Sequence, residues 1–337
     1  MDIALVLPTI REKHAREFLE TWDFNAQDIR VYVIEDNPNC TFDLDMPGDI
    51  VHYSWRDIRN RLGDKEWIIP RRTAAIRSFG YLEAYRDGAE IILTLDDDCL
   101  PVPLSGAASF AAEHKAMLGA VFSRWVDTIS TPSLSARGTP YRNRGETPTA
   151  INMGGWCNNP DIDAVTTLAI WGDGFRYRMA SWNPVPKGMY FSLCAMNVGF
   201  RRDATVLMYQ LLMSQDRKGK NWPFTRYDDI WGGVIAKKLC DELGWAITAG
   251  TPEIWHSKAS NVWTNLKLET TGMAVNEGFW KVIDEISIYA NGPVSAYAQI
   301  AHAMGKELKK AYPDYAAYWE TLCTAMNIWA EEIDSCG

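Results

Sequence analysis

The sequence lacks the short motifs by which several large enzyme classes are recognised. Its 337 residues contain no GxGxxG and no GxxxxGK[ST] stretch, which excludes a Rossmann dehydrogenase and a P-loop NTPase, and no GxSxG stretch of the serine hydrolases. No CxxC pair occurs either, so the seven widely spaced cysteines indicate neither a zinc site nor a thioredoxin motif. We expect these cysteines to be buried free thiols in a reducing compartment.

Positive charge and long apolar runs are also scarce. The chain has 34 Lys and Arg against 43 Asp and Glu, a net charge of −9, which argues against a nucleic-acid binder. No apolar stretch reaches the roughly 20 residues that cross a bilayer. The first residues begin a strand-like run at Ile3 instead of a basic leader followed by an apolar region. We expect a cytoplasmic protein that does not insert into a membrane.

Hydrophobic residues and tryptophan, by contrast, are plentiful. Hydrophobic residues make up 47% of the chain, enough to form a folded core. The 15 tryptophans serve either core packing or carbohydrate binding, because indole faces suit both. The length fits one large α/β domain with additions, or two modest domains.

Strand-like and helix-like stretches alternate over the first hundred residues. Apolar runs predict strands at 3–7, 30–34, 50–53 and 90–95, and helical spacing is found at 12–22 and 73–86. The alternation predicts an α/β fold with a mostly parallel sheet covered by helices. Ligands of such sheets lie beyond the carboxyl ends of the strands. We expect Pro8 and Thr9, Glu35 and Asp36, and the acidic run 96–98 to meet at one rim.

The remaining segments differ in composition. Residues 128–186 are rich in Gly, Pro, Asn, Thr and Arg and predict long loops with short strands, an arrangement typical of an active-site cover. Helical spacing returns at 228–243. The stretch from 276 to 333 is helical and rich in alanine, with a break at 291–293.

Asp96, Asp97 and Asp98 directly follow an apolar strand. Three adjacent carboxylates repel one another unless they are neutralised, and a divalent cation does this through oxygen ligands while also reaching a diphosphate. In an extended conformation Asp96 and Asp98 point to one side and Asp97 to the other. The run is therefore either a DxD metal site or a solvated acidic turn.

His256 and Lys258 lie in a polar segment, 255–261, that follows a predicted strand. A neutral imidazole suits Mn²⁺ as a third ligand beside carboxylates, and a nearby lysine suits a phosphate. The alternative for His256 is a structural histidine. A further cation, Arg77, stands on the apolar side of its helix, where its fork would fit diphosphate oxygens.

Asp228 and Asp229 open a predicted helix beside Arg226, Tyr227 and Trp231. The helix dipole and N-capping explain one acidic residue at this place. An adjacent pair next to an indole is typical of a sugar site, because carboxylates accept hydrogen bonds from hydroxyls and the indole supplies a flat apolar face.

Taken together, these motifs resemble the reversibly glycosylated polypeptides, the UDP-arabinopyranose mutases best known from plants. The matching strings occur in the same order along most of the chain. They are VLPTIR at 6–11, RSFGY at 77–81, TLDDDC at 94–99, PTA at 148–150, CAMN at 194–197, RYDDIW at 226–231 and HSKASN at 256–261. Beyond about residue 268 the chain resembles the family only in its helical type.

The resemblance implies a GT-A-like, Rossmann-like fold that rearranges a UDP-sugar between pyranose and furanose rings. It implies a nucleotide-sugar domain over 1–270 with the cover at 128–190, and a helical C-terminal region over 271–337. It also implies Mn²⁺ or Mg²⁺ at Asp96, Asp98 and His256. The nucleotide and substrate contacts that it implies are Pro8, Thr9, Arg11, Asp36, Arg77, Asp97, Asn197, Trp231 and Lys258.

The resemblance further implies reversible self-glycosylation on an arginine. Spacing from Pro148 places this arginine at Arg144, with Arg142 as an extra cation and with Gly145-Glu146 in the reverse of the family's order. Residues 35–37 read Glu-Asp-Asn where the family has Gln-Asp-Gly, and Asp36 is expected to contact uracil. Asp228 or Asp229 would handle the proton of the sugar hydroxyl.

Two other functions stay open at this point. One is a glycosyltransferase that passes the sugar from a UDP-sugar to a separate acceptor. The other is a non-catalytic UDP-sugar-binding partner, against which the DDD run and Arg144 count. A UDP-sugar is the expected ligand in every case, and the resemblance implies self-association into a homo-oligomer.

Overall fold

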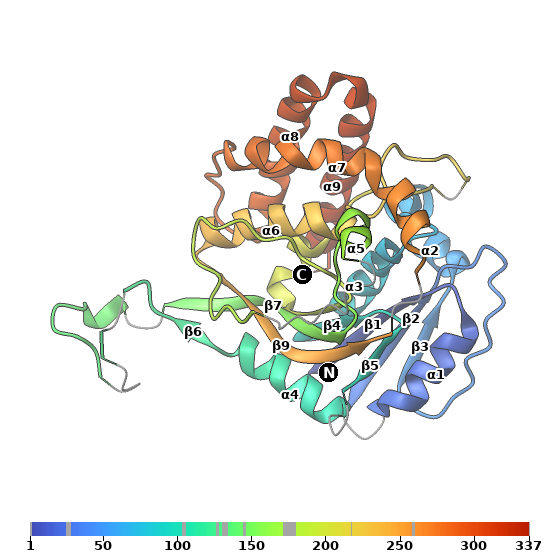
Figure 1. Cartoon of the computed structure of the whole chain (residues 1–337), viewed down its shortest axis with the longest axis horizontal. Coiled ribbons are helices and arrows are strands. Elements are labelled where there is room, and N and C mark those ends of the chain that lie inside the picture. Colours follow the sequence, from blue (N-terminus) through green and yellow to red (C-terminus); the bar gives the residue numbers. More distant parts are fainter. Residues whose placement is uncertain are drawn as a thin grey trace.

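A nine-stranded mixed sheet forms the centre of the computed structural model, which describes residues 2–24, 28–102, 106–125, 128–129, 134–143, 146–170, 180–216, 218–257 and 260–336 (Figure 1). Its strands are β1 (Ile3–Thr9), β2 (Ile29–Glu35), β3 (Ile50–Tyr53), β4 (Ile91–Leu95), β5 (Cys99–Pro101), β6 (Val121–Phe122), β7 (Thr147–Asn158), β8 (Asn197–Arg201) and β9 (Ala246–His256). Their order is β3-β2-β1-β4-β8-β7-β9-β5, and β6 pairs with β7.

Most strands of this sheet run in one direction. β1 pairs in parallel with β2 and β4, β2 with β3, and β7 with β9, whereas β8 and β5 run antiparallel to their neighbours. Thr9 lies opposite Glu35 at the carboxyl ends of β1 and β2, and its hydroxyl donates a hydrogen bond of 2.6 Å to Asp97 beyond β4. The predicted mostly parallel sheet and the meeting of these three strand ends are therefore confirmed.

Helices cover both faces of the sheet (Figure 1), with α1 and α4 on one side and α3, α6 and the C-terminal helices on the other. The α-helices are α1 (Glu12–Trp22), α2 (Trp55–Leu62), α3 (Arg77–Arg86), α4 (Ala107–Leu118), α5 (Ala164–Ala169), α6 (Asp228–Leu243), α7 (Val262–Asp284), α8 (Pro293–Ala311) and α9 (Ala316–Asp334). Short 3₁₀ turns lie at Gly63–Ile68, Ala74–Ile76, Tyr141–Asn143, Arg202–Met208 and Pro313–Tyr315.

Helix α1 shows how the sequence spacing sets the packing. Ala15, Phe18, Leu19 and Trp22 recur at helical intervals and are all buried against the sheet. The indole of Trp22 packs on Phe110 of α4 with ring centroids 5.0 Å apart, and its Nε1 donates a hydrogen bond of 2.9 Å to the Cys99 carbonyl. The helix is thereby fixed beneath the turn that carries the acidic run.

The C-terminal helices share their core with the sheet-bearing part of the chain. Trp319 and Trp329 of α9 are fully buried, and Trp329 Nε1 donates to the Val206 carbonyl at 3.0 Å. The break predicted at 291–293 is confirmed, because Gly292 adopts a φ of 112° and Pro293 opens α8. Helix α7 runs across residues 270 and 271, the predicted boundary, without interruption.

Strand β7 differs from the expectation for its segment. Residues 147–158 were expected to belong to a loop-rich cover, but they form a long strand, mostly buried, between β8 and β9. Close packing explains the misleading composition: a Cβ at Gly154 would lie 2.1 Å from the Asn197 amide nitrogen and 2.4 Å from the Pro252 carbonyl oxygen. Glycine is required there by a neighbouring strand, not by a loop.

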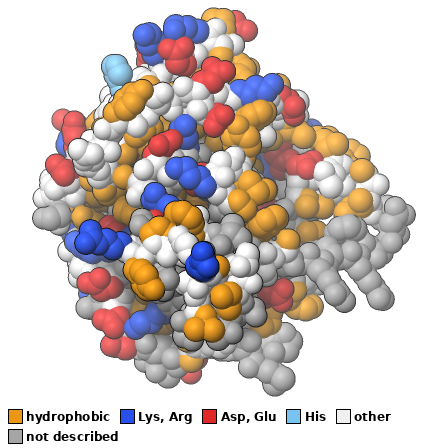
Figure 2. Space-filling view, turned by 90° about the vertical axis from the view of Figure 1, so that its left-hand side faces the viewer, with side chains coloured by type: hydrophobic (Ala, Val, Ile, Leu, Met, Phe, Trp, Pro, Cys, Tyr) orange, Lys and Arg blue, Asp and Glu red, His pale blue; other side chains and the backbone are white. Residues whose placement is uncertain are grey.

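Charged and apolar side chains are interspersed on the face of the molecule that Figure 2 shows. Among the described residues, no helix is both long and apolar enough to span a membrane. All seven cysteines are described and none forms a disulfide, which confirms the expected free thiols. Cys99, Cys194 and Cys240 are buried, while the other four are partly exposed.

Candidate active site

A cavity of about 570 Å³ opens beside the carboxyl end of β4, between the sheet and the first turn of α6. This volume falls within the range of roughly 300–1,000 Å³ that is usual for small-molecule sites. Its lining is rich in charge. The charged lining residues are Arg72, Arg77, Asp96, Asp161, Asp163, Arg226, Asp228, Asp229 and Glu269.

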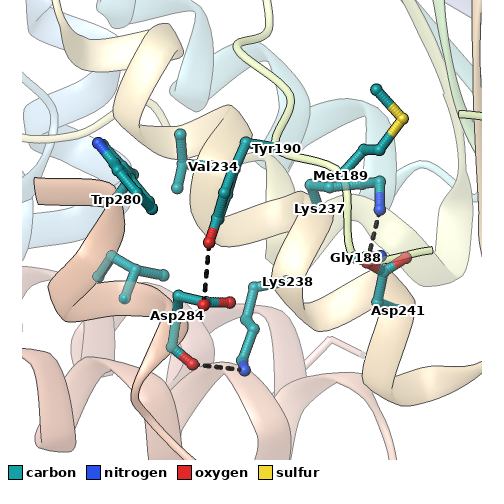
Figure 3. A pocket seen from close by; sticks show the side chains of 10 residues that line it. Gly188, Met189, Tyr190, Val234, Lys237, Lys238, Asp241, Trp280 and Asp284 are labelled. Atoms are coloured by element: carbon teal, nitrogen blue, oxygen red, sulfur yellow. Dashed lines mark hydrogen bonds and ion pairs between the residues drawn. The ribbon is translucent and has the colours of Figure 1, made fainter. Parts of the chain in front are cut away.

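A second pocket lies between residues 188–190 and helices α6 and α7 (Figure 3). Its volume is about 30 Å³, enough for one water molecule. The polar groups around it are engaged with each other: Tyr190 donates to Asp284 at 2.9 Å, and Lys237 pairs with Asp241 at 2.5 Å. This pocket is too small for a nucleotide sugar, so the larger cavity is the candidate site.

The acidic run 96–98 is a tight turn, and not the extended segment that was expected. The Cys99 amide donates a hydrogen bond of 3.1 Å to the Asp96 carbonyl, which closes the turn between β4 and β5. The turn directs the three carboxylates to different partners, so Asp96 and Asp98 do not share one face. Asp96 pairs with Arg77, and Asp98 lies 3.8 Å from His256 Nε2.

Asp97 links the end of β1 to this turn through contacts with Thr9 and Arg11. Its carboxylate forms an ion pair with Arg11 and accepts a hydrogen bond of 2.6 Å from the Thr9 hydroxyl. Pro8, the preceding residue of β1, is buried in the sheet opposite Ile34. Of these predicted nucleotide contacts, only Arg11 exposes a substantial part of its side chain, 37%, and none lines the cavity. Their contact with a nucleotide stays a prediction.

Arg77 is the buried cation of the site, with 1% of its surface exposed. Its guanidinium contacts the Asp96 carboxylate and the Ala195 carbonyl and donates 2.9 Å hydrogen bonds to the Thr94 hydroxyl and the Ala74 carbonyl. Burial by itself lowers the pKa of Arg77, but Asp96, Tyr81 and Asp229 together raise it by more, so the guanidinium stays charged. The predicted inward orientation of Arg77 is confirmed.

Asp228 and Asp229 lie side by side in the cavity at the start of α6. Burial, reinforced by the charge of Asp228, raises the pKa of Asp229 to about 7. Burial raises the pKa of Asp228 as well. Asp229 accepts hydrogen bonds from the Ala195 amide at 2.9 Å and from the Ile230 amide at 2.8 Å. A carboxyl whose pKa is near 7 both accepts and returns a proton at neutral pH.

Asp98 and His256 offer two of the ligands that a divalent cation needs. His256 Nδ1 donates a hydrogen bond of 3.0 Å to the Asn159 carbonyl, since that oxygen only accepts, and this leaves the Nε2 lone pair directed toward Asp98. Their separation of 3.8 Å exceeds a hydrogen bond and suits two ligands of one ion. Asp96 is held by Arg77 instead, and no group of three His, Cys, Asp or Glu residues suited to a metal is found within the described ranges.

Three other predicted residues lie outside the lining of the cavity. Asp36 is 4% exposed and accepts 2.8 Å hydrogen bonds from Trp55 Nε1 and the Thr73 amide, and burial raises its pKa to about 6. Asn197 is fully buried, with its amide bonded to the Gly155 and Pro252 carbonyls.

Trp231 is fully buried too, beneath the cavity and not in its wall. Its ring stacks on Phe279 of α7 at 4.6 Å, and its Nε1 donates a hydrogen bond of 2.9 Å to Asn276. The structure thus gives this indole a packing role between α6 and α7. Trp156, on β7, is the indole that lines the cavity.

Arg144 and Lys258 lie outside the described residues, as does Trp171, which was predicted to belong to the cover. The nearby turn Tyr141–Asn143 lies on an arm that projects from the sheet beyond β6 (Figure 1). None of the described residues of this arm lines the cavity. Residues 161–163, later in the predicted cover, do form part of its wall.

Glu269 of α7, which joins three parts of the site, was not predicted from the sequence. One of its carboxylate oxygens accepts a hydrogen bond of 3.1 Å from Arg226 Nε, and the other accepts one of 2.8 Å from the Ala164 amide. Arg226, two residues before Asp228, adopts a φ of 66°, a conformation uncommon outside glycine. Only long-range packing brings Glu269 here, so no local motif marks it. Asp161 was not predicted either, because the strand that precedes it, β7, was expected to be part of the loop-rich cover.

Comparisons with known proteins cover the whole chain. The family model for "Reversibly glycosylated polypeptide" matches residues 1–337. The UDP-arabinopyranose mutase 3 of Arabidopsis thaliana is 31% identical over 98% of this chain and 90% of its own length. The UDP-arabinopyranose mutase 1 of Oryza sativa subsp. japonica is 31% identical over 99% of this chain and 90% of its own.

Among solved structures, the 4-diphosphocytidyl-2C-methyl-D-erythritolsynthase of Anaerococcus prevotii DSM 20548 covers 74% of this chain and 89% of its own. Its identity is 11% and its TM-score 0.31. These values are too low to carry an argument about fold or function. The assignment of the sheet and its covering helices rests on the strand pairings described above.

Proposed function

Because the chain belongs to the family of reversibly glycosylated polypeptides, we propose that it is an intramolecular transferase that interconverts the pyranose and furanose forms of a UDP-sugar. The relatives that carry a specific name are UDP-arabinopyranose mutases. One observation supports the chemistry above all. The cavity holds the Asp228–Asp229 pair, with the pKa of Asp229 raised to about 7, together with the ion pair between the buried Arg77 and the partly exposed Asp96.

The first step we propose is cleavage of the bond between the anomeric carbon and the diphosphate oxygen. This leaves negative charge on UDP and an oxocarbenium-like sugar. A divalent cation bound at Asp98 and His256 would act as a Lewis acid toward the departing diphosphate. Arg77 keeps its charge in the cavity wall and orients Asp96, so a fixed positive group faces the region where the negative charge develops.

The second step exchanges the ring oxygen. The hydroxyl one carbon along attacks the anomeric carbon while the bond between that carbon and the ring oxygen breaks, and the diphosphate oxygen of UDP then bonds again to the anomeric carbon. Asp229, as a carboxylate, takes the proton of the attacking hydroxyl, and the oxygen released from the ring receives a proton from the same pair. Trp156 and residues 161–163 line this part of the cavity. They limit the access of water, which would otherwise hydrolyse the intermediate to free sugar.

Incubating the purified protein with Mn²⁺ and a panel of UDP-pyranoses and UDP-furanoses, without an acceptor, tests the proposed function. We expect an isomerised UDP-sugar, detected by NMR or chromatography. A protein that leaves UDP-sugars unchanged until a separate acceptor is added would be a glycosyltransferase. One that binds them with no reaction under either condition would be a binding partner. Either result contradicts the mutase proposal.

We predict that His256→Gln lowers the affinity for Mn²⁺ by about 10- to 100-fold or more, because it removes a nitrogen ligand. Direct binding is measured by electron paramagnetic resonance, without substrate. The control is His302→Gln, a histidine exposed on α8. Unchanged Mn²⁺ affinity in His256→Gln, with binding by the wild type, would show that the ion does not use this histidine.

For Arg144 we predict loss of self-glycosylation in both Arg144→Ala and Arg144→Lys. A guanidinium has a pKa above about 12 and attacks a sugar only when a carboxylate accepts its proton. Intact-mass spectrometry after incubation with the UDP-sugar should show one added sugar in the wild type and in Arg142→Lys, but none in the Arg144 variants. If both Arg144 variants also interconvert rings at the wild-type rate, Arg144 carries no obligatory intermediate.

We further propose a cytoplasmic location and self-association. The seven free thiols support a reducing compartment. Self-association rests on the family resemblance alone, and gel filtration combined with light scattering would test it.

A further inference from the structure

Arg72 stands at the mouth of the cavity in an unusual backbone conformation. Its φ is 59°, in the left-handed region that residues other than glycine rarely adopt. Such conformations persist only where the surrounding structure enforces them, and they concentrate at ligand sites. A turn of this kind is made most easily with glycine or asparagine, so the fold alone gives no reason for an arginine.

The surrounding structure enforces this conformation from both sides. The amide of Thr73, just after Arg72, donates a hydrogen bond of 2.8 Å to Asp36. The amide of Arg71, just before it, donates one of 2.9 Å to the Gln215 carbonyl. Asp36 is in turn held by Trp55 Nε1 at 2.8 Å. The backbone around Arg72 is therefore fixed before any ligand arrives.

Of the arginines among the described lining residues of the cavity, Arg72 is the one without an ion pair to a described residue. Arg77 is paired with Asp96, and Arg226 with Glu269 at 3.1 Å. Arg72 is exposed at the cavity mouth and forms no ion pair with the described residues. An arginine fork that is charged, exposed to the cavity and not engaged by a carboxylate is suited to phosphate oxygens.

We propose that Arg72 binds the diphosphate of the nucleotide sugar, and that Asp36 is a positioning residue that acts through the 71–73 turn. This proposal rests on the proposed function. It gives Asp36 a role other than the uracil contact that was expected. The turn fixes the backbone from which the Arg72 side chain extends, so no backbone entropy is lost at this position on binding.

Binding of UDP, uridine and inorganic pyrophosphate to the full chain tests the proposal by calorimetry, with and without Mn²⁺. We expect Arg72→Gln to weaken UDP and pyrophosphate binding by about 10- to 100-fold, the usual size of a charge-assisted hydrogen bond, and to leave uridine binding unchanged. The control for a lost positive charge is Arg59→Gln, an exposed arginine at the end of α2.

Two further variants separate binding from folding. Arg72→Gly adopts the left-handed turn without strain, so it should unfold at a higher denaturant concentration than Arg72→Gln while binding UDP equally weakly. Asp36→Asn should also weaken UDP binding, whereas Arg72→Gln combined with Asp36→Asn should bind no more weakly than Arg72→Gln alone. Additive losses would refute the positioning role of Asp36.

The outcomes distinguish this proposal from the proposed function. If the wild type binds UDP and Arg72→Gln binds it equally well, the role of Arg72 is wrong and the mutase proposal stands. If the wild type binds UDP through Arg72 but interconverts no UDP-sugar, the mutase proposal is wrong and the anion site stands. If the wild type binds none of the three probes, both are overturned.

Discussion

Replacing Asp229 with asparagine is expected to lower the rate of ring interconversion by about 10²–10⁴-fold, while the protein stays folded and becomes more stable at neutral pH. The amide occupies the same space and still accepts the hydrogen bond of either the Ala195 or the Ile230 amide. It has no basic lone pair for the hydroxyl proton. The loss should therefore appear in kcat rather than in KM.

The pH dependence of the wild type follows from the raised pKa of Asp229. Burial raises this pKa most, Asp228 and Asp161 raise it further, and the hydrogen bond from the Ala195 amide and the charge of Arg77 lower it. The base must be ionised to accept a proton, so the rate should fall as the pH drops through about 7. The two carboxyls titrate as a coupled pair, and the apparent value belongs to both.

Stability should change in the opposite direction. The folded state holds its proton up to about pH 7, whereas an unfolded aspartate loses it near 3.8. Between these values the folded chain binds more protons, so the free energy of unfolding decreases as the pH rises. Asp229→Asn removes this penalty and should gain on the order of 1–3 kcal/mol at pH 8.

Rate profiles and urea unfolding between pH 4 and 9 measure both effects. Asp45→Asn, an exposed carboxylate outside the cavity, is the matched control. An Asp229→Asn variant with the wild-type rate would show that this carboxyl is not the base. An Asp229→Asn variant that is less stable than the wild type at pH 8 would show that burial does not destabilise the ionised form of Asp229.

Arg77→Met is expected to destabilise the protein by about 3–5 kcal/mol and to remove its activity, the largest effect on stability that we predict. Methionine fills much of the same volume but leaves the Asp96 charge without its partner. It also leaves the Thr94 hydroxyl and the Ala195 carbonyl without the donor that now satisfies them. Asp96 keeps 30% of its side chain exposed, so the buried acceptors that lose their donor add much of the cost to that of the unpaired carboxylate.

A double-mutant cycle identifies the cause of this loss. Asp96→Asn removes the charge that Arg77→Met leaves unpaired, so the double variant should be more stable than the sum of the two single losses by about 0.5–3 kcal/mol. Denaturant unfolding of the four proteins gives the coupling. Arg77→Lys, which keeps the charge but loses the fork, should fall between wild type and Arg77→Met. Additive losses would mean that the ion pair itself contributes nothing.

The periodic elements and the position of the site were predictable from the sequence, because both follow from local patterns. The apolar runs of β1, β2 and β4 and the spacing of α1 depend on neighbours in the chain. The parallel arrangement then brings Thr9, Asp36 and Asp97 to one rim by a general rule of such sheets.

What the sequence could not provide depends on contacts between distant residues. From sequence alone, Gly154 indicates a loop. The structure shows instead that glycine is needed there because the Asn197 amide packs directly against it. Trp231 lies close to Asp228 and Asp229 in sequence but packs on Phe279, because adjacent positions on a helix point in different directions. The acidic run departs from an extended strand through one turn hydrogen bond, which its composition does not specify.

The contacts of helix α7 determine where the C-terminal segment of this enzyme can be exchanged with that of a relative. Glu269, on this helix, holds both Arg226 and the start of α5, and a Cβ at Gly272 would lie 2.2 Å from the ring of Tyr227. Helix α7 therefore forms part of the cavity wall, and its surface at Gly272 packs closely against Tyr227. Swapping C-terminal segments between relatives should succeed only when α7 stays with its own residues 226–229, which places the crossover point after Asp284.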